Sequence, residues 1–248
     1  MKRKERHQLK GNELAEMIVA ARTGFEANQS RLALILLIVV VAAAVVGGVT
    51  VWRRNTDARA EQLLADAMVA FNARVVPVSA NPTQPGEVPA AASIGATGSF
   101  STLTAKLNAA LPKLKAAADG YPDSDAGITA RYHYASSLAA VGRHDEAVRA
   151  FDEVARRAGP DSLYGGMALF GKADAQARAG QLDAAIATWK ELASSSDEAL
   201  PKDAILMELG KAYQAAGKTE EARKTLTQLV DEHPTSPYSA EARAELGS

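Results

Sequence analysis

The sequence predicts an all-α protein in which a single transmembrane helix precedes an α-solenoid of about three helical hairpins plus flanking half-repeats. An uncharged run occupies residues 32–52, and a glycine/alanine register recurs three times after residue 140. The C-terminal half is rich in Ala, Leu, Glu, Lys and Arg, which are good helix formers. Alternating β-branched runs, which would indicate strands, are nearly absent after residue 80.

Composition excludes several classes of protein. The 248 residues include no cysteine, so the chain has no disulfide, no thiolate metal site and no cysteine nucleophile. The formal net charge of −1 provides no field that would attract DNA or RNA. We therefore expect no nucleic-acid partner.

Residues 1–31 are expected to form a cytoplasmic tail with a short amphipathic helix. Its apolar positions fall at helical spacing: Leu14, Met17, Ile18, Ala21 and Phe25. Such a helix docks on a partner or lies on a membrane surface. Charges of both signs lie between the apolar residues. This mixture favours contact with a partner, or no contact at all, over binding to lipid.

Residues 32–52 read LALILLIVVVAAAVVGGVTVW and predict a transmembrane helix. A helix of this length rises roughly 31 Å, about the thickness of one hydrocarbon core. Trp52, Arg53 and Arg54 follow, and these residue types suit the membrane interface. The run exceeds the apolar region of a typical cleaved signal peptide, so an uncleaved anchor is the better interpretation.

The distribution of positive charge predicts the orientation of the anchor. Seven Lys or Arg residues precede the apolar run, whereas Arg53, Arg54 and Arg59 follow it closely. The positive-inside rule then places the N-terminus in the cytoplasm and the remainder on the other side of the membrane. Close to the helix ends the positive charges on the two sides are nearly balanced, so the reverse orientation stays the alternative.

The membrane helix also contains two pairs of small residues four positions apart, Ala43/Gly47 and Ala44/Gly48. They would let two such helices approach each other, although such pairs also occur by chance.

Two connecting segments follow the membrane helix. Residues 53–74 predict a helical extension with Leu63, Leu64, Met68 and Phe71 as its apolar positions. Residues 75–100 are rich in Pro and Gly and carry one charge, Glu87, so they predict a flexible loop.

Residues 101–248 are expected to form a repeat domain. A glycine is followed five residues later by an alanine, and four residues after that by a large apolar side chain. The three sets are Gly142/Ala147/Phe151, Gly180/Ala185/Trp189 and Gly217/Ala222/Leu226. The period of 38 and then 37 residues indicates stacked helical hairpins. The glycine ends the first helix of each hairpin in a left-handed cap, and the alanine permits a close crossing of the two helices.

These registers resemble the tetratricopeptide repeat family. The third unit matches the pattern best, through Leu206, Leu209, Gly210, Tyr213, Ala222, Leu226 and Pro234. The second unit departs from it, because Lys172 and Gln176 occupy an apolar and an aromatic position. By the same register, residues 101–119 look like a second helix whose partner lies in residues 57–74, and Tyr238–Leu246 looks like a capping helix.

The resemblance implies that the first helix of each hairpin lines a concave groove. The equivalent groove positions are Tyr132, Phe170 and Met207, with Ser136, Asp174 and Lys211 one turn later. Such a stripe would accept an extended or helical peptide. Alternatively, the first three side chains only pack between neighbouring helices.

The whole arrangement resembles the ancillary subunit family of the bacterial Sec translocon. This resemblance implies an adaptor or chaperone-like subunit that binds envelope or translocon proteins and client peptides. It also implies that the anchor lies in the inner (plasma) membrane, with the repeat domain on the periplasmic side. A structural tether that self-associates without binding clients is the alternative. The four histidines and the acidic residues form no catalytic or metal-ligand pattern, so we expect no enzyme activity, no metal and no cofactor.

Overall fold

The computed structural model describes residues 3–76, 99–159, 162–194 and 200–247, with side chains described from residue 33 onward. Within these residues it contains nine helices and one pair of two-residue strands. The chain divides into two compact units, one ending at Asn55 and the other covering Thr56–Ser248. The all-α prediction is thereby confirmed, with the short strand pair as its one departure in the described part of the chain.

The helix α1 (Arg3–Phe71) contains the whole predicted transmembrane run. The side chains of the amphipathic tail helix lie outside the described residues, and so does most of the predicted loop at 75–100. The two ends of that loop are held together by the parallel pairing of β1 (Arg74–Val75) with β2 (Ser99–Phe100). A further hydrogen bond runs from the Val76 amide to the Phe100 carbonyl at 2.8 Å.

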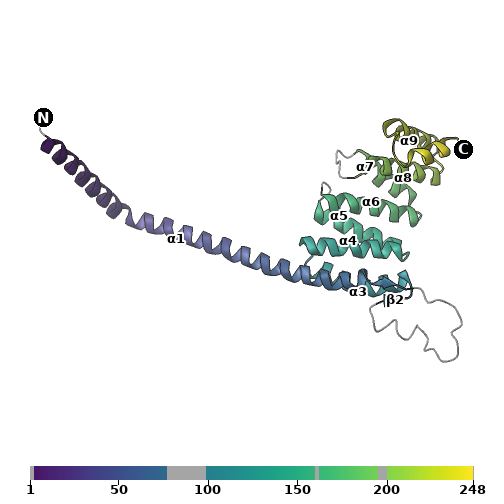
Figure 1. Cartoon of the computed structure of the whole chain (residues 1–248), viewed down its shortest axis with the longest axis horizontal. Coiled ribbons are helices and arrows are strands. Elements are labelled where there is room, and N and C mark those ends of the chain that lie inside the picture. Colours follow the sequence, from purple (N-terminus) through teal and green to yellow (C-terminus); the bar gives the residue numbers. More distant parts are fainter. Residues whose placement is uncertain (1–2, 77–98, 160–161, 195–199, 248) are drawn as a thin grey trace, which may run out of the picture. The chain divides into compact units, whose positions relative to one another are not determined.

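Three helical hairpins make up most of the second unit. They are α4 (Asp125–Ala140) with α5 (His144–Ala158), α6 (Leu163–Arg178) with α7 (Leu182–Ser194), and α8 (Lys202–Ala215) with α9 (Thr219–Glu232). Each hairpin packs on the next, as Figure 1 shows. The predicted stack of three hairpins is therefore confirmed.

The hairpin turns follow from the predicted glycine register. Gly142, Gly180 and Gly217 have φ angles of 83°, 77° and 71°. In each turn the residue after the glycine donates its amide hydrogen to a carbonyl five residues earlier, as from Arg143 to Leu138 at 2.9 Å. This bond and the left-handed glycine define a Schellman cap, which satisfies carbonyls that would otherwise be unpaired at the helix end.

The core between the hairpins also follows the register. The three crossing alanines are almost fully buried, and so are Phe151, Trp189 and Leu226. Gly210 lies so close to Leu226 that a methyl group there would come within 2.6 Å of a side-chain carbon. Small residues at the crossing and large residues one turn later therefore interlock, as close packing requires.

Both ends of the stack carry additional helices. At one end the last turns of α1 pack on α3 (Leu103–Gly120) through Ala67, Ala70, Ala110 and Leu114. This contact confirms the expected first hairpin, whose two helices are separated by the Pro-rich segment. At the other end α10 (Ser239–Gly247) covers Met207 and Leu229 with Ala242 and Leu246, as expected of a cap.

Candidate partner-binding groove

An open cleft of about 260 Å³ lies between α6, α7 and α8. It combines apolar residues of all three helices with charged residues of α6 and α8. Its lining residues are Asp174, Ala177, Arg178, Leu182, Trp189, Glu208, Lys211, Ala212 and Ala215. Two of the six predicted groove residues, Asp174 and Lys211, are thus brought to one surface.

The floor of this cleft is apolar and tightly packed. Trp189 is only 1% exposed, and its ring meets that of Phe170 edge-on with the ring centres 4.6 Å apart. Ala173, Ile186 and Leu209 complete the cluster beneath it. Aromatic pairs in this geometry add to the stability given by burial alone.

The rim carries two acids and two bases that are already paired. Arg178 bonds Asp174 at 2.9 Å, and Lys211 lies 3.5 Å from Glu208 and 3.0 Å from Glu241 of α10. The hydrogen bond that Arg178 donates to the Asp174 carboxylate holds the pKa of Arg178 above its ordinary value. Partial burial lowers the pKa of Lys211, but Glu241 and Glu208 together raise it above its ordinary value. Both cations therefore stay charged, and the rim has no charge in excess.

The large predicted groove residues lie elsewhere. Tyr132 is half-buried, with its ring centre 5.9 Å from that of Phe151 and 5.7 Å from that of Tyr164 in α6. Phe170 is half-buried against Trp189, and Met207 is fully buried beneath α10. These contacts correspond to the alternative expectation of packing between neighbouring helices. Ser136 is partly exposed on α4, outside the cleft. The role of all six residues in binding stays a prediction.

Several lining residues were missed by the sequence analysis. Arg178 lies one turn after Asp174 on α6, and Glu208 lies one turn before Lys211 on α8. Extending the register by one turn would have found Arg178 and Ala215, whereas Glu208 lies next to Met207 and outside the register. Leu182 and Trp189 come from the second helix of the hairpin, and no pattern of first-helix positions could have added them to the cleft.

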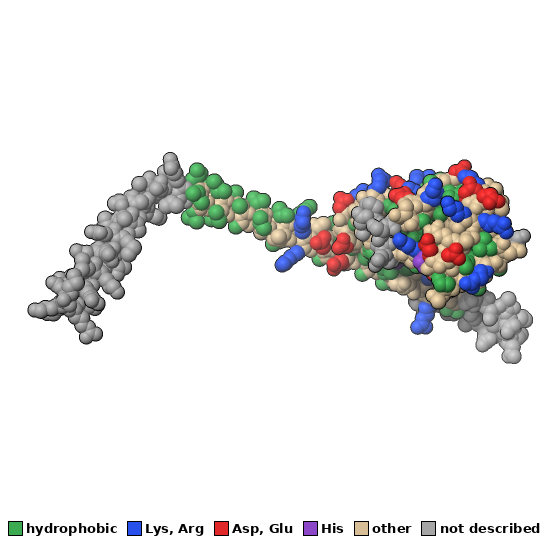
Figure 2. Space-filling view, turned by 90° about the horizontal axis from the view of Figure 1, so that it is seen from above, with side chains coloured by type: hydrophobic (Ala, Val, Ile, Leu, Met, Phe, Trp, Pro, Cys, Tyr) green, Lys and Arg blue, Asp and Glu red, His purple; other side chains and the backbone are tan. Residues whose placement is uncertain are grey.

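The apolar run of α1 is exposed along its length. The stretch Ala33–Phe71 contains a window with a mean hydropathy of 3.0, none of which is buried. Figure 2 shows apolar side chains along this run and charged ones beginning where it ends. By length and composition, the helix is apolar enough to cross a membrane. Among the described residues, no group of three or more His, Asp or Glu side chains is arranged to hold a metal ion.

Comparison with known proteins identifies the hairpins. One tetratricopeptide repeat family model matches residues 132–204, and a second matches residues 204–236. Two crystal structures of nearly identical TPR-like repeats from a kinesin light chain candidate of Podosopora anserina are similar in fold. The first has a TM-score of 0.50 at 19% identity, covering 57% of this chain and 76% of that one. The second, a Q17M variant, has a TM-score of 0.51 with the same identity and coverage.

This degree of sequence identity shows the fold alone, and no curated protein matches the sequence. The family models and the similarity of fold both indicate tetratricopeptide repeats. Residues 132–236 therefore consist of tetratricopeptide repeats, within a helical solenoid of the tetratricopeptide type.

Proposed function

We propose that this protein is a membrane-anchored adaptor that binds other proteins through the cleft between α6 and α8. Tetratricopeptide repeats generally mediate contacts between proteins and are typically non-catalytic scaffolds. The observation that carries the proposal is the cleft itself, an open concave site with an apolar floor and a polar rim. Sites of this kind bind apolar groups and orient them through a few polar contacts.

The chemistry of the cleft suggests what its partner presents. The rim acids and bases neutralise one another, so a strongly charged peptide finds no unpaired charge of opposite sign among the lining residues. A volume of about 260 Å³ is smaller than a typical drug-sized site and suits one or two apolar side chains. The expected partner is a peptide segment that places an apolar side chain over Leu182 and Trp189.

The cellular setting belongs to the same proposal. The apolar run of α1 supports anchoring in the inner membrane, and the charge distribution supports a cytoplasmic N-terminus with a periplasmic repeat domain. The resemblance to the ancillary Sec translocon subunit supports a chaperone-like role in envelope translocation or assembly. Its partners would be translocon or envelope proteins and emerging client peptides.

Blocking the cleft tests the proposal. Ala215 is exposed at the end of α8 and lines the cleft, whereas Ala187 is exposed on α7 outside it. We expect Ala215→Trp to fill the cleft and abolish co-purification of specific partners from membranes solubilised in mild detergent. Ala187→Trp adds the same side chain elsewhere and should leave co-purification intact. Equal recovery of the same partners by both variants would exclude the cleft as the binding site.

A structural tether is the second candidate function. The packing of Tyr132, Phe170 and Met207 inside the stack favours it, because these side chains offer little surface to a client. A tether should give cross-links only between its own copies when a photoreactive residue replaces Ala215, whereas an adaptor should give cross-links to other proteins.

A further inference from the structure

No side-chain hydrogen bond or ion pair crosses the cleft between α6 and α8 within the residues that the structure describes. Arg178 pairs with Asp174 of its own helix, and Lys211 pairs with Glu208 of its own helix. Ala215, which lines the cleft on α8, carries only a methyl group. A side chain of another molecule can therefore enter between the two helices without breaking an existing bond between them.

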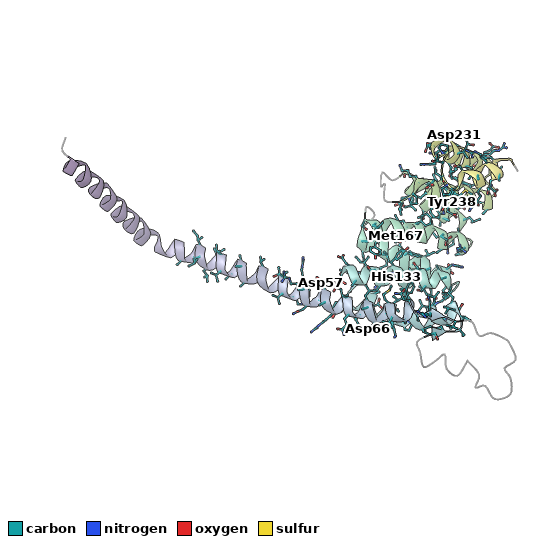
Figure 3. The ribbon with its side chains drawn as sticks, in the orientation of Figure 1. Asp57, Asp66, His133, Met167, Asp231 and Tyr238 are labelled. Carbon is teal, nitrogen blue, oxygen red and sulfur yellow. The ribbon has the colours of Figure 1, made fainter. Side chains whose placement is uncertain are left out.

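The next interface in the stack, between α8 and α10, is crossed by polar bonds. Gln214 of α8 donates to Glu245 of α10 at 3.0 Å, and Lys211 lies 3.0 Å from Glu241 of α10. Tyr238, labelled in Figure 3, packs against the same core of α8 and α9 residues that α10 covers. Of these two interfaces, the one between α6 and α8 is therefore the more accessible to a side chain from outside.

Arg178 places an oriented, flat cation on one wall of this cleft. Its Nε donates to both carboxylate oxygens of Asp174, at 3.1 and 2.9 Å. Its two terminal amino groups make no hydrogen bond within the described part of the chain, and its side chain is 63% exposed. Lys211 lines the cleft from the other helix, α8. Two cations therefore flank the apolar floor, and the planar one of them is held by its inner edge only.

A cation beside an apolar site attracts the face of an aromatic ring, because the π electrons give that face a partial negative charge. The guanidinium group also stacks on such rings through its own plane. Leu182 and Trp189 line the same cleft and favour an apolar group. We propose that the side chain that a partner places in the cleft is aromatic, and that Arg178 stacks on its ring and determines this selectivity. The inference rests on the adaptor function proposed above.

Other classes of side chain fit this cleft less well. An aliphatic side chain would gain the same apolar floor but no attraction from the cations at the rim. A carboxylate would have to compete with Asp174, Glu208 and Glu241, which already pair with both cations. A basic side chain would meet those two cations and would lose its water over an apolar floor, which is costly for a charged group. The aromatic ring gains from both the floor and the rim.

Disulfide exchange at a single cysteine tests this preference, since the natural chain has none. Ala215→Cys places a thiol in the lining of the cleft, and Ala187→Cys places one on α7 outside it. The full chain in mild detergent is equilibrated with equal amounts of reagents that attach a phenethyl, an isoamyl or a carboxyethyl group through a disulfide bond. Intact mass measures the amount of each attached group. Comparison of the two variants removes differences among the reagents in reactivity and in affinity for detergent.

We expect the ratio of phenethyl to isoamyl groups to be about threefold higher for Ala215→Cys than for Ala187→Cys. A factor of this size is what one exposed contact between a cation and a ring contributes. Equal ratios for the two variants would overturn the proposal. A preference of Ala215→Cys for the carboxyethyl group would also overturn it, because the rim would then select an acid.

The role of Arg178 is tested in the chain that carries Ala215→Cys. Arg178→Met keeps an unbranched apolar side chain without the guanidinium group, and should reduce the preference for phenethyl to the value of Ala187→Cys. Arg178→Lys keeps the charge but loses the plane, so it should retain part of the preference. An unchanged preference in Arg178→Met would show that the floor alone selects the ring, and the role assigned to Arg178 would be wrong.

These outcomes are distinguishable from failure of the adaptor function. If Ala215→Trp abolishes co-purification of partners but the phenethyl preference is absent, the adaptor function stands and the aromatic selectivity is wrong. If the preference is present but Ala215→Trp and Ala187→Trp recover the same partners, the selectivity of the cleft stands and the adaptor function through this cleft is wrong.

Discussion

At the scale of single residues, the hairpin turns depend on a conformation that glycine adopts without strain. Gly180 has φ 77°, and a methyl group built on it would meet no atom within 4 Å. Gly180→Ala should therefore lower the free energy of unfolding by about 1 kcal/mol, through backbone strain alone. Chemical denaturation followed by circular dichroism measures this loss.

The control for this prediction is Gly180→Asn. Asparagine tolerates the left-handed region better than alanine does, so its loss of stability should be smaller even though its side chain is larger. If Gly180→Asn lowered the free energy of unfolding more than Gly180→Ala does, crowding by the side chain rather than the backbone conformation would control the turn.

His133 gives the fold a pH dependence. Burial lowers the pKa of this imidazole, whose ring centre lies 4.9 Å from that of Phe71. In the unfolded chain the imidazole has its ordinary pKa near 6.5, whereas in the folded chain it takes up the proton only at lower pH. Protonation of His133 therefore does not lower the stability of the fold above pH 6.5. As the pH falls below about 6.5, stability should decrease until the folded pKa is passed.

The measurement compares denaturation midpoints at pH 7.5 and pH 5.5 for the natural chain and for His133→Gln. The variant cannot take up the proton, so it should lose less stability between the two pH values. The carboxyl groups of Asp119 and Asp152, whose pKa values are lowered by Lys115 and Lys172 respectively, titrate further into acid and should not contribute over this interval. An equal loss of stability between the two pH values in both chains would show that His133 is not the group responsible.

At the scale of helices, one arginine connects three of them. Arg131 on α4 donates to Glu153 on α5 at 2.7 Å, and to the Asp119 carboxylate and the Ala118 carbonyl on α3 at 2.9 and 3.0 Å. Arg131 is only 8% exposed, and its bond to the Ala118 carbonyl is buried, whereas both carboxylates are partly exposed. In the next two units the equivalent register positions hold Leu169 and Leu206.

Replacing this residue by Arg131→Leu should lower the free energy of unfolding by about 2 kcal/mol. Three hydrogen bonds from a charged donor are lost, but both carboxylates are partly exposed and can return to water. The charge-preserving Arg131→Lys should recover only part of the loss, because one ammonium cannot reach all three acceptors. A fully stable leucine variant in urea denaturation would show that packing at this position outweighs the polar network.

At the scale of the whole molecule, periodic features were predictable from sequence and non-periodic ones were not. The glycine caps, the crossing alanines and the capping helix follow from spacing, since each hairpin repeats the same local physics. The Arg131 network and the β1–β2 pairing occur once, and their partners are distant in sequence. The register brought Asp174 and Lys211 to the surface of one cleft, but it could not show that α10 covers Met207. Whether that cleft binds a partner stays a prediction.

The orientation of the anchor is a property of the whole chain and can be tested with two cysteine variants. Gln8→Cys marks the predicted tail, and Ala187→Cys marks an exposed position of the repeat domain. If positive charge retains the tail in the cytoplasm, a membrane-impermeant maleimide should label Ala187→Cys in intact spheroplasts and Gln8→Cys only after lysis. The opposite pattern would mean that Arg53, Arg54 and Arg59, next to the apolar run, outweigh the more distant positive charges of the tail. Labelling of Ala187→Cys only after lysis would contradict an exported repeat domain, and its partners would then have to be sought in the cytoplasm.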